Sequence, residues 1–167
     1  MMPTQIVKKA VRWTIEYPQP IHTFFPLLGF DPGTVNLGIA KTLQDETIDL
    51  YELTLDRNKD AALRIMEIYF LMNDLKFDMN QSIVVIEGAS YGNQFRQVEL
   101  AEMRAAITIW SRQRGARKVS IIPPNSLRKE VFGKATITAH DYWDDIEIDR
   151  DALAALSCLY YADKKGI

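Results

Sequence analysis

The stretch LLGFDPGTVNLGIAKTLQDETIDLYELT, residues 27–54, decides the class of fold. Its apolar start, LLGFD at 27–31, predicts a buried strand, and the Pro32-Gly33 pair that follows predicts a turn. Two further strands are predicted at 36–42 and 47–54. Together the three strands predict an antiparallel meander at the start of a sheet.

Beyond the meander, strand and helix patterns alternate along the chain. Residues 82–87, SIVVIE, form a continuous apolar run that ends in an acid, which is typical of a central parallel strand covered on both faces. A fifth strand is predicted at 118–122. Helices are predicted at 60–75, at 94–113, in a short segment ending at Phe132, and at 150–163. This order predicts an α/β fold: a mixed five-stranded sheet, three antiparallel strands plus parallel strands, with helices on both faces.

The helix at 60–75 has apolar residues on two sides. Ile65 and Ile68 share one face, and Leu63 and Phe70 lie roughly opposite. We therefore expect this helix to be buried on more than one side.

The length of the chain favours a single domain. At 167 residues it is long enough for one domain with a core and short for two. Residues 1–26 contain several prolines near their end, and we interpret them as an N-terminal extension to a domain at 27–167. The pattern at 6–15 fits either a short strand or a short helix.

Composition narrows the class of protein. With 47% hydrophobic and 25% charged residues, the chain resembles an ordinary globular protein, which argues against disorder. No apolar run approaches the roughly 18 residues of a membrane span, and no signal peptide is recognisable. The single cysteine, Cys158, lies in an apolar stretch, so we expect a buried thiol in a reducing compartment. We therefore expect a cytoplasmic protein with no membrane partner.

Charge is distributed unevenly along the chain. The net charge of -2 by itself counts against a nucleic-acid partner. Residues 93–134, however, carry nine basic and three acidic side chains, and residues 135–167 carry three basic and seven acidic ones. A basic central segment followed by an acidic C-terminal segment suits a protein that binds phosphates and holds a divalent cation. Two ordinary solvated surfaces would give the same pattern.

Three acids stand at the edges of buried elements. Asp31 ends the first strand, Glu87 ends the run VVIE, and Asp151 opens the last helix. Each alone has an ordinary explanation: a turn-initiating Asp, an exposed strand end, or an acid that complements the helix dipole. Ligand sites in such sheets gather at strand carboxyl ends, so together the acids predict a site for Mg²⁺ or Mn²⁺. Two such ions can activate a water and stabilise the leaving oxygen of a phosphodiester.

Four segments also carry a family resemblance. They are GFDPGTVNLGIA at 29–40, VVIEGASYG at 84–92, IIPPNSLRKEVFGK at 121–134 and DRDALAALSCLYYAD at 149–163. In this order they resemble the two acidic motifs, the basic segment and the final helix of RuvC-type Holliday junction resolvases, which belong to the ribonuclease H-like superfamily. The resemblance covers about residues 27–163.

The resemblance implies a ribonuclease H-like fold and a homodimer that nicks four-way DNA. It also implies that four acids hold two Mg²⁺ ions, for which Mn²⁺ can substitute. Asp31, Glu87 and Asp151 match the family motifs directly. The family usually has its fourth acid three residues before the last of these, where this chain has Ile148, so Asp149 is the nearest substitute and Glu147 the next.

We therefore predict a catalytic, metal-holding set and a DNA-binding set. The first comprises Asp31, Glu87, Asp149 and Asp151. In the second, aromatic side chains would stack on a base at the branch point and basic ones would contact phosphates. Its members are Tyr91, Phe95, Arg96, Arg128, Lys129 and Lys134. Core aromatics and a solvated helix face are the ordinary alternatives for these residues.

Other functions compete with junction resolution. A ribonuclease H-like nuclease for another substrate, such as an RNA–DNA hybrid or a flap, would share the same motifs. A catalytically eroded DNA-binding module is supported by Ile148. An actin-like ATPase is opposed by length and by the lack of a second phosphate loop, so we expect no nucleotide cofactor. As a divergent resolvase, the protein is expected in a bacterium or phage-infected host, with an organelle as the alternative.

Overall fold

The computed structural model contains one mixed sheet in the strand order β1-β2-β5-β4-β3-β6-β7. It describes residues 4–7, 10–89 and 94–165, with only the backbone at 4–7 and 94–96. The strands are β1 (Thr4–Val7), β2 (Ala10–Glu16), β3 (Leu27–Pro32), β4 (Asn36–Thr42), β5 (Thr47–Thr54), β6 (Ile83–Glu87) and β7 (Lys118–Ile122). The helices are α1 (Ala61–Asp74), α2 (Gln94–Gln113), α3 (Pro124–Phe132), α4 (Ala139–Tyr142) and α5 (Arg150–Lys165).

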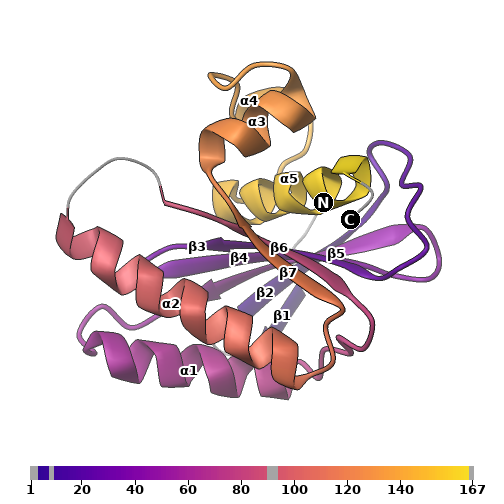
Figure 1. Ribbon diagram of the computed structural model, residues 1–167. Helices are drawn as coiled ribbons and strands as arrows, with labels where there is room; N and C mark the ends of the chain where they lie inside the picture. The colour runs from indigo at the N-terminus through magenta and orange to yellow at the C-terminus, as the bar shows by residue number, and fades with distance from the viewer. Residues whose placement is uncertain (1–3, 8–9, 90–93, 166–167) are drawn as a thin grey trace.

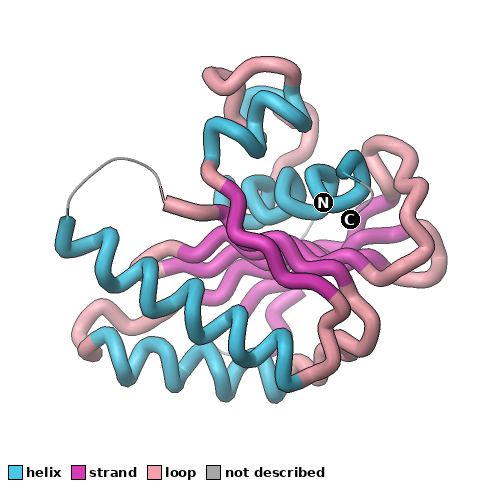
Figure 2. Tube along the Cα trace, in the orientation of Figure 1, coloured by secondary structure: helices cyan, strands magenta, loops and turns pink. Residues whose placement is uncertain are grey.

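The helices form a layer on each side of the sheet. Helices α1 and α2 lie side by side on one face, and α5 lies on the other with α3 and α4 beyond it (Figures 1 and 2). Strands β3, β4 and β5 form the predicted antiparallel meander, and β6 and β7 extend it as parallel strands next to β3. The predicted mixed sheet with helices on both faces is therefore confirmed. None of the helices in the described ranges is long and apolar enough to span a bilayer.

The sheet has seven strands, so the prediction of five was wrong. The additional strands, β1 and β2, come from the segment that we interpreted as an N-terminal extension. Strand β2 pairs antiparallel with β5, and it buries Trp13 and Ile15 while Thr14 and Glu16 point outward. This alternation is short, and a partner far along the chain supplies its pairing, so the local sequence pattern did not distinguish a strand from a helix.

The segment after β2 is tied to α5. The Tyr160 hydroxyl donates to the main-chain oxygen of Gln19 at 2.6 Å and accepts from its N–H at 3.0 Å. The Asp163 carboxylate accepts from the main-chain N–H groups of His22 and Thr23. The expected extension therefore contributes both strands and loop contacts to the same folded unit as residues 27–165.

Helix α1 differs from its predicted burial. Ile68 and Met72 are buried toward the sheet, whereas Leu63 and Phe70 are 47% and 59% exposed. The expectation that α1 is buried on several sides was therefore wrong. The reason is the layering: α1 covers a single sheet face beside α2, and no described element packs on its outer side.

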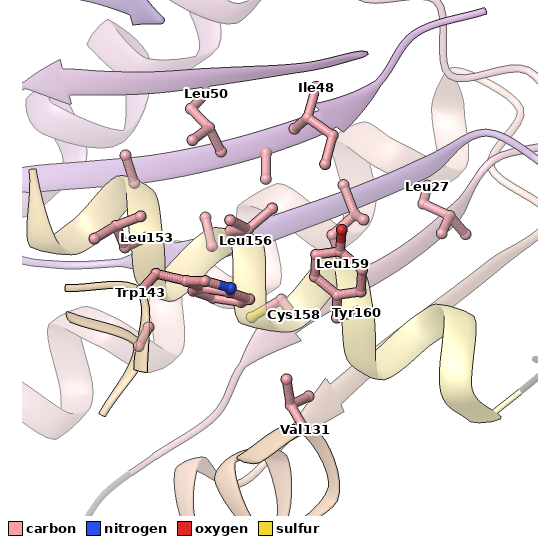
Figure 3. Packing of buried hydrophobic residues seen from close by; sticks show 14 of the residues in the cluster. Leu27, Ile48, Leu50, Val131, Trp143, Leu153, Leu156, Cys158, Leu159 and Tyr160 are labelled. Atoms are coloured by element: carbon pink, nitrogen blue, oxygen red, sulfur yellow. The ribbon is translucent and has the colours of Figure 1, made fainter. Parts of the chain in front are cut away.

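Helix α5 is the centre of the core on the other face. Its leucines and Cys158 are buried between the sheet and the α3–α4 segment, where Val131 and Trp143 pack against them (Figure 3). The predicted buried thiol is therefore confirmed. The helix approaches the strands closely because Gly38 on β4 lacks a side chain, and a β-carbon there would collide with the main-chain oxygen of Asp151. This contact fixes the start of α5 over the middle of the sheet.

Candidate active site

One row of residues crosses four neighbouring strands on the α5 face. Asp31 of β3 pairs with Gly38 of β4, which in turn pairs with Glu52 of β5. On the other side of β3, the parallel register pairs Phe30 with Ile86 of β6, and the next residues, Asp31 and Glu87, have their side chains in contact. The row therefore runs Glu52, Gly38, Asp31, Glu87, with three acids interrupted by one glycine.

The first turn of α5 sits over the gap that Gly38 leaves. This position brings the Asp151 carboxyl within hydrogen-bond reach of Asp31 and of the Asn36 side chain. The carboxyl of Asp149, the residue immediately before α5, hydrogen bonds with Glu52. The helix start thus adds two acids to the three on the sheet.

Asp31, Glu87 and Asp151 line a single pocket of about 210 Å³. The structure therefore brings together the three acids that the sequence places at the edges of buried elements. Arg128 lines the same pocket from α3. The other residues that line the pocket include Leu127, Phe132, Thr138, His140, Arg150 and Ser157.

Burial and like charge raise the pKa values of these acids. Burial is the largest cause of the pKa of Asp31 lying well above its ordinary value, and Glu87 and Asp151 raise it further. Burial also raises the pKa of Glu87 and of Asp151. Arg128 opposes the shift at Asp31 and Glu87. The pocket thus holds three acids against two arginines, Arg128 and Arg150, and a bound divalent cation would relieve the repulsion among the acids.

Glu52 is the acid that the sequence analysis missed. Burial raises its pKa to about 8, and the neighbouring Asp149 and Asp151 act in the same direction. A signal for it existed in β5, because Ile48, Leu50 and Glu52 alternate onto one face. Glu52 places an acid on the strand face where Ile48 and Leu50 are apolar, and so breaks the pattern. Asn36, which hydrogen bonds with Asp151, was also missed.

The donor chemistry of these residues fits a divalent cation. Within the described ranges, no three His, Cys, Asp or Glu side chains are arranged so that they could hold an ion as they stand. The carboxyls instead hydrogen bond with one another, Asp31 with Glu87 and Asp151, and Glu52 with Asp149. Such pairs share protons, and losing those protons leaves the hard oxygen donors that Mg²⁺ and Mn²⁺ prefer.

The residues considered for the position of the fourth acid, Glu147, Ile148 and Asp149, have different surroundings in the structure. Ile148 is only 7% exposed and packs in the core on the α5 side, so its side chain is a structural one. Glu147 is exposed and lines a different groove with Tyr17. Asp149, by contrast, interacts with Glu52 and with Asp151.

The DNA-binding candidates are only partly described. Arg128 lines the acidic pocket, and Lys129 and Lys134 are exposed on and just after α3. Tyr91 and the side chains of Phe95 and Arg96 lie outside the described residues.

Comparisons with known proteins identify the fold of this chain through solved structures and not through sequence. No protein-family model and no curated protein sequence matches the chain. A structure of Thermus thermophilus RuvC matches with a TM-score of 0.62 and 12% identity, covering 85% of this chain and 97% of that one. The chain has the RuvC fold. A second structure, T. thermophilus RuvC in complex with a Holliday junction substrate, matches with a TM-score of 0.63 at 12% identity, covering 85% and 96% of the two chains. The ribonuclease H-like fold implied by the sequence motifs is thereby confirmed.

Proposed function

We propose that this protein is a metal-dependent endonuclease that nicks branched DNA and resolves four-way junctions by phosphodiester hydrolysis. The observation that carries the proposal is the convergence of Asp31, Glu87 and Asp151, from two strands and a helix, in one pocket. The fold supports it, because RuvC shares that fold and has a structure with a Holliday junction substrate.

In this proposal Asp31, Glu87 and Asp151 hold the metal, with Asp149 as the fourth acid. Bound Mg²⁺ or Mn²⁺, in two sites, would activate a water and stabilise the leaving oxygen of the phosphodiester. The acids must be deprotonated to serve as ligands, so their raised pKa values would set the lower pH limit of activity. Arg128 in the same pocket favours the deprotonated forms and offers a planar guanidinium to a DNA phosphate.

DNA is proposed to lie over α3 and across the mouth of the pocket. Arg128, Lys129 and Lys134 supply positive charge there, which fixes the position of the phosphates without reading sequence. Tyr91, Phe95 and Arg96 are proposed to meet the branch point from the segment after β6.

We further propose a homodimer, because resolving a junction requires two opposed nicks. Exposed apolar side chains on the outer side of α1 and α2 support it, among them Phe70 at 59% and Ile109 at 58% exposure. An exposed apolar surface of this kind is typical of a protein–protein interface. It lies on the face of the sheet opposite α5, so pairing through it would leave both acidic pockets open.

The test is cleavage of a synthetic four-way junction in Mn²⁺, compared with an RNA–DNA hybrid and a flap. We expect the parent protein to nick the junction in preference, and Glu87→Gln to lose cleavage while it still binds the junction. Preference for the hybrid or the flap would favour the other nuclease function. Junction binding without metal-dependent cleavage of any substrate would favour an eroded DNA-binding module.

A further inference from the structure

We propose that Glu52 is a metal-holding residue of this site and that it forms, with Asp149, the half of the site that Ile148 leaves without an acid. This inference rests on the proposed nuclease function. It adds a residue from β5, a strand to which no sequence motif assigned a role.

The buried position of Ile148 creates the need for such a residue. Its side chain packs among core residues contributed by α5 and the sheet, and an acid there would be buried in an apolar environment. The adjacent exposed acid, Glu147, faces the groove beside Tyr17 instead. Asp149 is thus the acid before Asp151 that faces the site, and Glu52 is its partner.

The sheet register places Glu52 in line with the acids of the pocket. Glu52, Gly38 and Asp31 are consecutive partners across β5, β4 and β3. Neighbouring strands lie about 4.8 Å apart, so the backbones of Glu52 and Asp31 are separated by roughly 10 Å. Gly38 leaves the space between them free of any side chain, and the first turn of α5 projects into that space. Asp149 and Asp151 therefore enter between the two ends of the row.

This arrangement gives two groups of carboxyls on either side of Gly38. Asp31, Glu87 and Asp151 form one group, and Glu52 with Asp149 forms the other. A Glu side chain is one methylene longer than that of Asp, which helps Glu52 reach toward the pocket from the more distant strand. Two adjacent groups of oxygen donors are what a pair of divalent ions requires.

A purely structural role explains Glu52 poorly. The preceding residues on the same strand face, Ile48 and Leu50, are fully buried and apolar. A carboxyl that continues this row and faces Asp149 and Asp151 brings like charges together at a half-buried position. Such a contact destabilises the folded protein unless a proton or a cation compensates it.

The experiment is Mn²⁺ binding to the full-length protein without DNA, measured by isothermal titration calorimetry and by electron paramagnetic resonance. We expect Glu52→Gln to lose one bound ion, or to bind it at least about tenfold more weakly, with Asp149→Asn giving the same result. Because both residues would serve one ion, the double variant should lose little more than either single variant. Glu147→Gln, a matched exposed acid outside the site, should bind Mn²⁺ as the parent does.

A second measurement separates metal binding from folding. If Glu52 holds a cation, Glu52→Gln should leave the melting temperature of the metal-free protein unchanged or raise it, while the increase caused by Mn²⁺ becomes smaller. Mn²⁺ binding equal to that of the parent in Glu52→Gln overturns the role of Glu52 and leaves the nuclease proposal standing. If the parent itself binds no Mn²⁺, the proposed function fails, and this inference fails with it.

Discussion

Gly38 and Asp151 form the contact that sets the geometry of the acidic pocket. A β-carbon on Gly38 would occupy the space of the Asp151 main-chain oxygen, so α5 can start over β4 only because residue 38 is glycine. The clash is with backbone atoms, which cannot rotate away as the end of a flexible side chain can.

We therefore predict that Gly38→Ala displaces the start of α5 and abolishes cleavage. Overpacking of this kind costs about 1–3 kcal/mol or more, measurable by urea unfolding. Loss of Mn²⁺ binding should accompany it, because Asp149 and Asp151 move with the helix. The control is Gly133→Ala, where a β-carbon meets no atom within 4 Å but φ is 83°. It should lose about 1 kcal/mol through backbone strain and keep Mn²⁺ binding. A Gly38→Ala protein as stable and active as the parent would refute the packing argument.

The sequence predicted part of this site because part of it depends on local pattern. Asp31 and Glu87 end apolar strands and Asp151 begins a helix, so their positions relative to the core follow from nearby residues. The alternation within β5 shows only that Glu52 shares a face with Ile48 and Leu50. Its place beside the other acids depends on the register of β5 against β4, which local pattern does not reveal.

Local sequence pattern also predicted only part of the fold. The meander at 27–54 forms from neighbouring segments and was predicted, whereas β2 pairs with β5 about 35 residues away and was not. Helix α4 is a single short turn with a side-chain cap from Thr138, too short to produce a periodic apolar pattern. Pairing over long sequence separations and very short elements account for the strands and the helix that were missed.

Arg128 should set the lower pH limit of activity. Its positive charge opposes the rise in the pKa values of Asp31 and Glu87. Removing that charge in Arg128→Gln raises both pKa values further, so the acids stay protonated to a higher pH. The acid limb of the pH–rate profile should therefore move to higher pH. Lys129→Gln, an exposed neighbour on the same helix, should leave the limb in place. An unmoved limb in Arg128→Gln would mean that this guanidinium does not influence the ligands.

Junction binding should depend steeply on salt. If Lys129 on α3 and Lys134, two residues after it, contact phosphates, Lys129→Ala and Lys134→Ala should each reduce the slope of log K against log salt by about 1. Both should weaken binding to junctions of different sequence equally, because phosphate contacts carry no base information. Lys118→Ala is the matched control, since Lys118 is exposed at the opposite end of β7 from the pocket. Equal affinity of the parent at low and at physiological salt would contradict the phosphate contacts.

Self-association should require the apolar outer side of α1 and α2. Phe70 and Ile109 are more than half exposed there, and a lysine at either position would bring a charge into an interface that excludes water. We predict that Phe70→Lys and Ile109→Lys convert a dimer to a monomer in sedimentation velocity, with unfolding midpoints close to that of the parent. Ile121→Lys is the control, because Ile121 is a similarly exposed apolar residue, at 48%, that lies on strand β7 rather than on α1 or α2. The monomeric variants should still bind Mn²⁺. They should nick one strand of a junction at a time, without the paired cuts that separate the junction into two duplexes. Dimers of unchanged stability in both variants would place the interface on another surface of the protein.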